Sequence, residues 1–129
     1  MPLLQTYLVE DSLLIRESLI ATLEEMAPVR VIGSAEDELT ALHLLSTHEV
    51  DLVIIDIFLK AGSGLGVLKA AQTTSARPGN RRHHVVLSNY STPAMRERCL
   101  SLGADGVFDK STEIDALIAY CDALAKQLR

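Results

Sequence analysis

"DLVIIDIFLKAGSGLG", residues 51–66, joins a strongly apolar run to a polar, glycine-containing segment. It contains four consecutive apolar residues, Leu52–Ile55, with no polar residue among them. Such a run is typical of a parallel strand that is buried on both faces of a sheet. The run ends at Asp56, and a glycine-containing loop follows. This placement raises the question of what a carboxylate does at the end of a buried strand.

Strand-like and helix-like patterns alternate along the chain on both sides of this stretch. We expect strands at 5–9, 29–35, 52–56, 84–88 and 106–109. We expect helices at 13–26, 37–49, 64–74, 91–103 and 111–128. This alternation predicts an α/β fold with a parallel sheet that is covered by helices on both faces. The 129 residues show no linker, so residues 1–129 are expected to form a single domain.

Side-chain patterns give further local predictions. In helix 13–26, the inward face is predicted from apolar residues at helical spacing, which are Ile15, Leu19, Leu23 and Met26. The neighbouring Leu14 lies off this face and is expected to contact a partner protein. A capping box of Thr112 and Asp115 is expected to start helix 111–128. The basic segment 80–84, Asn-Arg-Arg-His-His, is interpreted as a solvated loop.

Charge and cysteine content exclude several functions. The formal net charge of −5 argues against broad nucleic-acid binding and against docking on anionic lipid. No apolar run approaches the ~18 residues that a membrane span needs. Cys99 and Cys121 lie far apart and lack metal-ligand spacing, which favours a reduced, cytoplasmic protein. We therefore expect no direct nucleic-acid partner and no membrane partner.

Polar residues end four of the five expected strands. They are Glu10 and Asp11 after the first strand, Asp56 after the third, Ser88 at the end of the fourth, and Lys110 after the fifth. In parallel α/β sheets, sites form beyond the carboxyl ends of the strands, at the point where the strand order reverses. We therefore expect these side chains to meet at one edge of the sheet.

This set of residues indicates phosphoryl chemistry. Crowded carboxylates repel one another, and a hard divalent cation such as Mg²⁺, which prefers oxygen ligands, relieves the repulsion. We expect Asp11 and Asp56 to bind the ion directly, and Glu10 to bind it directly or through water. An ionised Asp56 is a nucleophile that can form an aspartyl-phosphate. Lys110 is expected to share the charge of the phosphoryl oxygens, and the Ser88 hydroxyl to donate to one of them.

Five segments in this order resemble the receiver domain of bacterial two-component response regulators. They are "VED" at 9–11, "VIIDI" at 53–57, "GSG" at 62–64, "LSN" at 87–89 and "GADGVFDK" at 103–110. The likeness covers essentially the whole chain. It implies a flavodoxin-like, doubly wound (βα)5 fold, with a five-stranded parallel sheet in strand order 2-1-3-4-5.

The resemblance also implies a function. A histidine kinase or phosphotransfer protein would transfer a phosphoryl group to Asp56 in the presence of Mg²⁺. The protein would then be a phosphoacceptor that takes part in its own phosphorylation and dephosphorylation, and not an enzyme. By resemblance, Glu10 and Asp11 are the acidic metal pair, Phe58 lends its backbone carbonyl to the metal, Ser88 is the switch hydroxyl, and Lys110 pairs with the phosphate.

Phosphorylation is expected to bias the surface formed by helix 91–103, strand 106–109 and helix 111–128. That surface would bind a downstream protein or form a homodimer. Two arrangements fit the sequence equally: a stand-alone regulator that acts by protein contact, and a receiver with an appended output domain.

The chain departs from the usual receiver pattern at three positions. Val107 stands where receivers often carry an aromatic switch residue, and the adjacent Phe108 is expected to point to the other face of its strand. Ser111 and Lys60 stand where proline is common. These departures motivate an alternative, a pseudo-receiver that binds partners independently of phosphorylation. A nucleotide-binding or flavin-binding protein is disfavoured, because the turn at 10–12 is acidic and lacks glycine.

Overall fold

The computed structural model describes residues 3–72, 82–89 and 92–127. Within these residues the strands are β1 (Leu4–Val9), β2 (Val29–Ala35), β3 (Leu52–Ile55), β4 (His83–Ser88) and β5 (Gly106–Asp109). The helices are α1 (Leu13–Met26), α2 (Glu38–Thr47), α3 (Gly64–Ala71), α4 (Pro93–Ser101) and α5 (Ile114–Gln127). Each strand is followed by a helix, as the alternating patterns predict. The expected helix ends at 73–74, 91 and 128 lie outside the described residues.

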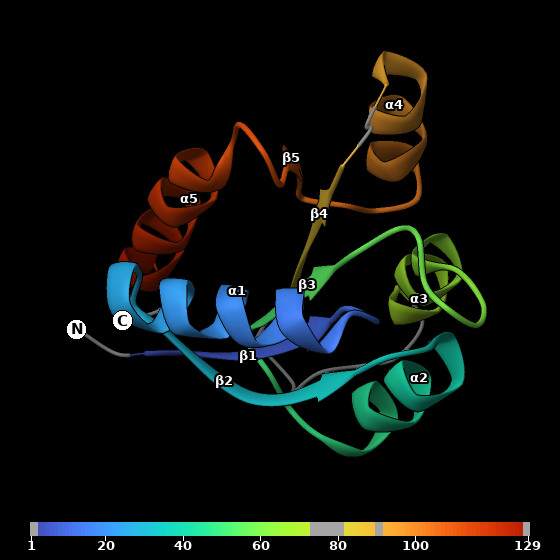
Figure 1. Ribbon diagram of the computed structural model, residues 1–129, viewed down its shortest axis with the longest axis horizontal. Coiled ribbons are helices and arrows are strands. Elements are labelled where there is room, and N and C mark those ends of the chain that lie inside the picture. The colour runs from blue at the N-terminus through green and yellow to red at the C-terminus, as the bar shows by residue number, and fades with distance from the viewer. Residues whose placement is uncertain (1–2, 73–81, 90–91, 128–129) are drawn as a thin grey trace.

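The described strands form one parallel sheet in the order β2-β1-β3-β4-β5, with helices on both faces (Figure 1). Near their carboxyl ends, Val9 pairs with Ile55 and Ser88 pairs with Asp109. This register places the carboxyl ends of β1, β3, β4 and β5 along the same edge of the sheet. The predicted doubly wound fold with strand order 2-1-3-4-5 is therefore confirmed.

Two apolar clusters lie on opposite faces of the sheet. Helices α1 and α5 cover one face, and α2, α3 and α4 cover the other (Figure 1). The central strand β3 supplies both clusters: Leu52 and Ile54 face α1 and α5, whereas Val53 and Ile55 face α2, α3 and α4. Full burial of each such side chain stabilises the fold by roughly 1.5–3 kcal/mol. No helix in the described part of the chain combines the length and apolar character that a membrane crossing requires.

Strand β5 alternates as expected. Val107 joins the cluster that faces α2, α3 and α4. Phe108 points to the other face, where its ring meets Tyr120 of α5 edge-to-face with 5.9 Å between the ring centroids. The prediction that these neighbours point to opposite faces is confirmed.

The inward face of α1 is shorter than predicted. Leu19 and Leu23 are buried, but Ile15 is 39% exposed and Met26 is 58% exposed. Ile15 borders the pocket at the edge of the sheet instead of packing on the strands, and Met26 is the last residue of the helix. The inward prediction was therefore wrong for these two residues.

The start of α5 also differs from the prediction. The helix begins at Ile114, and Thr112 does not cap it through its side chain. Instead, the Asp109 carboxylate accepts hydrogen bonds from the backbone N–H groups of Ser111 (2.7 Å) and Thr112 (3.2 Å). The carboxylate of Asp109 therefore organises the turn before α5.

The basic segment before β4 is not wholly solvated. Arg82 is buried, and its guanidinium donates to the carbonyls of Ala71 (2.8 Å) and Leu45 (3.3 Å) and to the ring of His84 (3.0 Å). Burial lowers the pKa of this guanidinium. Arg82 therefore ties the start of β4 to the ends of α2 and α3. Residues 80–81 lie outside the described residues.

Candidate functional site

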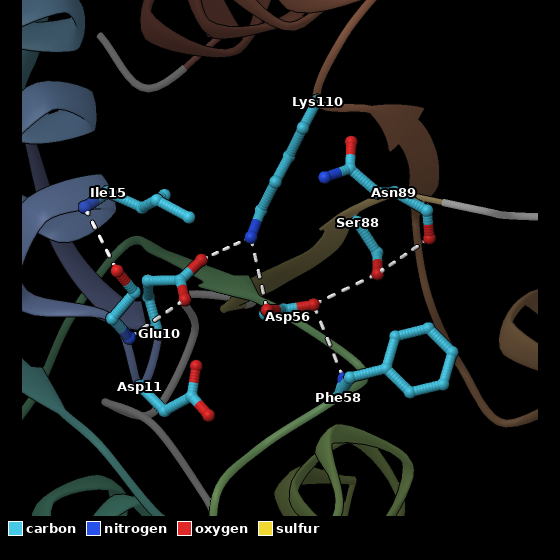
Figure 2. A pocket seen from close by; sticks show the side chains of 9 residues that line it. Glu10, Asp11, Ile15, Asp56, Phe58, Ser88, Asn89 and Lys110 are labelled. Carbon is cyan, nitrogen blue, oxygen red and sulfur yellow. Dashed lines mark hydrogen bonds and ion pairs between the residues drawn. The ribbon is translucent and has the colours of Figure 1, made fainter.

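The polar residues that end the strands meet in one pocket of about 330 Å³ (Figure 2). It is lined by Glu10, Asp11, Ser12, Ile15, Asp56, Phe58, Ser88, Asn89 and Lys110. Glu10 and Asp56 are 1% and 7% exposed, and Ser88 is fully buried. Glu10 and Asp11 follow β1, Asp56 follows β3, Ser88 ends β4 and Lys110 follows β5. The structure therefore brings together the side chains that the sequence predicted to meet.

Lys110 connects two of the carboxylates. Its ammonium group forms ion pairs with the Glu10 Oε1 atom and with the Asp56 Oδ2 atom, the latter at 3.1 Å (Figure 2). All three side chains are largely withdrawn from solvent. A charged, hydrogen-bonded donor between two buried carboxylates fixes their relative position.

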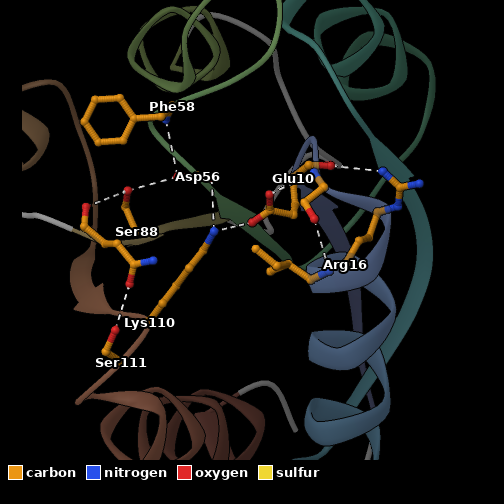
Figure 3. Close-up of polar contacts among 10 residues, drawn as sticks. Glu10, Arg16, Asp56, Phe58, Ser88, Lys110 and Ser111 are labelled. Carbon is orange, nitrogen blue, oxygen red and sulfur yellow. Dashed lines mark hydrogen bonds and ion pairs between the residues drawn. The ribbon is translucent and has the colours of Figure 1, made fainter.

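Asp56 is held by a second set of donors on its other oxygen. The Ser88 hydroxyl donates to Asp56 Oδ1 at 2.9 Å, and the Phe58 backbone N–H donates to the same atom at 3.3 Å (Figure 3). Ser88 Oγ also lies 3.2 Å from the backbone carbonyl oxygen of Asn89. The Asp56 carboxylate is therefore oriented by Ser88 of β4, by Lys110 just after β5 and by the backbone of its own loop.

Burial and pairing act in opposite directions on the charges of the site. Burial raises the pKa of Glu10, and the hydrogen bonds from Lys110 and from the Ser12 backbone N–H (3.1 Å) offset this only in part. For Lys110, burial lowers the pKa, but the hydrogen bond to Glu10 and the charge of Asp56 outweigh it, so its pKa is raised. The lysine therefore stays cationic between the two carboxylates.

Arg16 of α1 supports the acidic pair, and the sequence analysis missed it. Its guanidinium donates to the Glu10 backbone carbonyl at 3.0 Å (Figure 3). The same group pairs with the Glu36 carboxylate at 3.2 Å. These contacts join the turn after β1 to the turn after β2. An arginine in the first turns of α1 is a weak signal in the sequence, because the contact depends on the path of the backbone.

Three carboxylates in the pocket fit a divalent cation. One oxygen each from Glu10, Asp11 and Asp56 lies within 4.8 Å of the others. The Asp11 carboxylate makes no hydrogen bond or ion pair with another residue that the structure describes, so its oxygens are open to a ligand. Together with Lys110, the set carries two formal negative charges and offers only oxygen ligands. A hard cation such as Mg²⁺ suits this donor set. A role for the Phe58 carbonyl stays a prediction.

The departures from the receiver pattern have visible consequences around Ser88. Val107 places an aliphatic side chain on the face of the sheet that α4 covers, at the position where receivers often carry an aromatic residue. Ser111, where proline is common, donates its hydroxyl to the Asn89 side-chain carbonyl at 2.9 Å (Figure 3). The loops that follow β4 and β5 are thus joined by a side-chain hydrogen bond.

The chain matches a known family along most of its length. The family model of the response regulator receiver domain matches residues 6–122. The chain is 28% identical over 116 residues to the transcriptional regulatory protein YdfI of Bacillus subtilis, and the matched region covers 90% of this chain and 52% of that protein. It is 26% identical over 122 residues to the nitrate/nitrite response regulator protein NarP of Escherichia coli, and here the matched region covers 95% of this chain and 55% of NarP. The chain thus spans about half the length of these two relatives.

A solved structure agrees. The signal receiver domain of the response regulator NarL from Mycobacterium tuberculosis superposes with a TM-score of 0.81 at 25% sequence identity. The likeness covers 97% of this chain and 98% of that domain. The whole described architecture is therefore shared with a receiver domain.

Proposed function

The chain belongs to the family of response regulator receiver domains, and on this premise we propose that its site accepts a phosphoryl group on Asp56. The observation that supports this proposal most strongly is the convergence of Lys110 and Ser88 on the two oxygens of one buried carboxylate. Neither contact would be needed at a solvated strand end.

In the proposed reaction, an Asp56 carboxylate oxygen attacks the phosphorus of a phosphohistidine on a histidine kinase or phosphotransfer protein. The new O–P bond forms as the N–P bond breaks, and the imidazole nitrogen keeps the electron pair and takes a proton. Catalysis of such transfers depends on positioning and on stabilising the charge of the phosphoryl oxygens. The Lys110 ammonium is held beside Asp56 by Glu10, and the Ser88 hydroxyl can donate to a second oxygen.

Glu10, Asp11 and Asp56 would hold Mg²⁺, with the Phe58 carbonyl as a further ligand. When bound, the ion supplies positive charge that neutralises the phosphoryl oxygens. The buried, free thiols of Cys99 and Cys121 suit a reducing compartment, and we place the reaction in the cytoplasm.

We propose that the phosphoryl donor docks beside α1. Leu14 is 77% exposed there and borders a groove with Ile15, Asn89 and Ser111. The groove adjoins Lys110, so an apolar contact at Leu14 would bring the donor next to the site. Phosphorylation would then change the surface of α4, β5 and α5, which would bind a downstream protein, an appended output domain or a second copy of the chain.

The proposal is tested by incubating the protein with acetyl phosphate and Mg²⁺ and measuring the intact mass. We expect a gain of one phosphoryl group in the wild type and none in Asp56→Asn. A wild type that gains no mass, or a gain that survives Asp56→Asn, would reject the proposal.

The pseudo-receiver remains the second candidate, because Val107 stands where receivers often carry an aromatic residue. That residue often couples the switch hydroxyl to the surface of α4, β5 and α5. The pseudo-receiver is distinguished by partner binding. If the protein is a pseudo-receiver, the wild type and Asp56→Ala should bind the partner equally well. If it is a phosphorylation-dependent receiver, a phosphoryl donor should change partner binding by the wild type but not by Asp56→Ala.

A further inference from the structure

We infer that Glu38, the first residue of α2, is a positioning residue for the loop 57–63, and that through this loop it sets the metal affinity of the site. The inference rests on the proposed function for its link to Mg²⁺. The loop leads from Asp56 to α3 and carries Phe58, and α2 lies beside α3 (Figure 1). No side chain of α2 lines the pocket that contains Asp56, so Glu38 does not contact the site directly, and the loop connects the two.

Glu38 holds the loop on both sides of Gly62. Its backbone N–H donates to the carbonyl of Ala61 at 3.1 Å. Its carboxylate accepts a hydrogen bond from the Ser63 backbone N–H at 2.8 Å. Gly62 between them has a φ of +82°, a conformation that residues with a Cβ adopt at a cost. One residue of α2 therefore fixes three consecutive loop residues.

Two glycines make room for the Glu38 side chain. A Cβ on Gly62 would overlap the Glu38 Cβ, and a Cβ on Gly66 in the first turn of α3 would overlap the Glu38 carboxylate. The "GSGLG" of residues 62–66 is therefore shaped around this side chain. A fit of this kind exceeds what a solvated glutamate at a helix start requires.

The position of the loop is passed directly to Asp56. The Gly64 N–H donates to the Ile57 carbonyl at 2.9 Å, which closes the loop at its base. The Gly64 Cα lies against the Asp56 carbonyl so closely that a Cβ would overlap it. A shift of residues 62–64 therefore displaces the backbone of Asp56 and Ile57. The Phe58 N–H, which donates to Asp56 Oδ1, would move with them (Figure 2).

The experiment measures Mg²⁺ affinity by calorimetric titration in Glu38→Ala, Glu38→Gln and Gly66→Ala. Groups that orient metal ligands typically affect affinity by 10–100-fold, so we expect Glu38→Ala to weaken Mg²⁺ binding by about tenfold. In Glu38→Gln the amide oxygen still accepts from Ser63, so binding should stay within about twofold of wild type. Gly66→Ala should displace the carboxylate and reproduce much of the effect of Glu38→Ala.

A second readout needs neither metal nor phosphoryl transfer. The amide chemical shifts of residues 56–58 in the Mg²⁺-free protein should change in Glu38→Ala and be restored in Glu38→Gln. The matched control is Glu25→Ala, which removes the same charge from an exposed position on α1 and should leave both readouts unchanged.

The outcomes separate this inference from the proposed function. Wild-type affinity and unchanged shifts in Glu38→Ala overturn the inference and leave phosphorylation of Asp56 untouched. Equal weakening in Glu38→Ala and Glu38→Gln also overturns it, because charge and not the bond to Ser63 would then be responsible. If the wild type binds no Mg²⁺, the proposed function falls, and the amide shifts alone decide whether Glu38 positions the loop.

Discussion

Lys110 is the residue that balances the charge of the pocket. Its ammonium group is buried between Glu10 and Asp56, and both carboxylates depend on it for a cationic partner among the residues that the structure describes. Removing one partner of a buried ion pair leaves an uncompensated charge, which costs more than the intact pair contributes. We therefore expect the lysine to stabilise the site as well as to serve the proposed phosphoryl transfer.

We expect Lys110→Met to lower the free energy of unfolding in Mg²⁺-free buffer by about 3 kcal/mol, because the methionine fills a similar volume but leaves Glu10 unpaired. Urea denaturation at neutral pH measures this difference. Lys69→Met, which removes a charge from an exposed position on α3, is the control and should change little. A Lys110→Met protein as stable as the wild type would show that the ion pairs are not formed in solution.

At the scale of elements, Arg96 joins α4, β5 and the start of α5, which form the surface that phosphorylation is proposed to change. Its guanidinium donates to the Val107 carbonyl of β5 at 2.9 Å and pairs with the carboxylate of Glu113, just before α5. Glu113 also accepts from the Asp109 backbone N–H at 2.9 Å. Helix α4 is therefore fastened to β5 and to the start of α5 by polar contacts, next to the position where the aromatic switch residue is missing.

This contact predicts a specific dependence of stability on pH. The hydrogen bonds from Arg96 and from the Asp109 backbone hold the pKa of Glu113 below its usual value of 4.5. A carboxyl group with a lowered pKa in the folded state stabilises the fold above its unfolded pKa, and this stability is lost as the pH falls through the folded pKa. Below pH 4.5, the stability of Glu113→Gln should therefore fall less steeply than that of the wild type.

Urea unfolding at a series of acidic pH values measures this slope. The matched control is Glu25→Gln, at an exposed position of α1, which should keep the slope of the wild type. Parallel slopes in Glu113→Gln and wild type would contradict the pairing with Arg96.

At the scale of the whole molecule, metal binding should raise the free energy of unfolding. A ligand that binds only the folded state stabilises it by mass action, by about 2.7 kcal/mol at a concentration one hundred times its dissociation constant. We expect Mg²⁺ to raise the free energy of unfolding of the wild type in this way. Asp11→Asn should show a much smaller effect, because its unpaired carboxylate is lost. An equal response in both proteins would place the metal elsewhere.

The sequence predicts the fold and the meeting of the site residues because both follow from local patterns. Apolar runs mark the strands, and in a parallel sheet the residues after Val9 and Ile55 must share one edge. Contacts that depend on tertiary geometry do not follow from such patterns. Arg16 reaches the Glu10 carbonyl, and Arg82 is buried, only because of how α1 and the ends of α2 and α3 lie.

Errors at helix ends have the same origin. Helical spacing includes Ile15 in an apolar face, but spacing does not reveal that the first turn of α1 lies beside a polar pocket and not on the sheet. Thr112 has the right spacing for a cap, but the helix begins only at Ile114, and the Asp109 carboxylate organises the turn before it by accepting from the N–H groups of Ser111 and Thr112. Both cases show a tertiary or competing local contact that overrides a valid sequence pattern.

The most direct measurement is the location of the phosphoryl group. The protein is phosphorylated with acetyl phosphate with or without Mg²⁺, reduced with borohydride, which converts an aspartyl-phosphate to homoserine, and mapped by peptide mass spectrometry. We expect homoserine at position 56, formed only when Mg²⁺ is present. Homoserine at another aspartate, or equal labelling of Asp56 without a divalent metal, would contradict it.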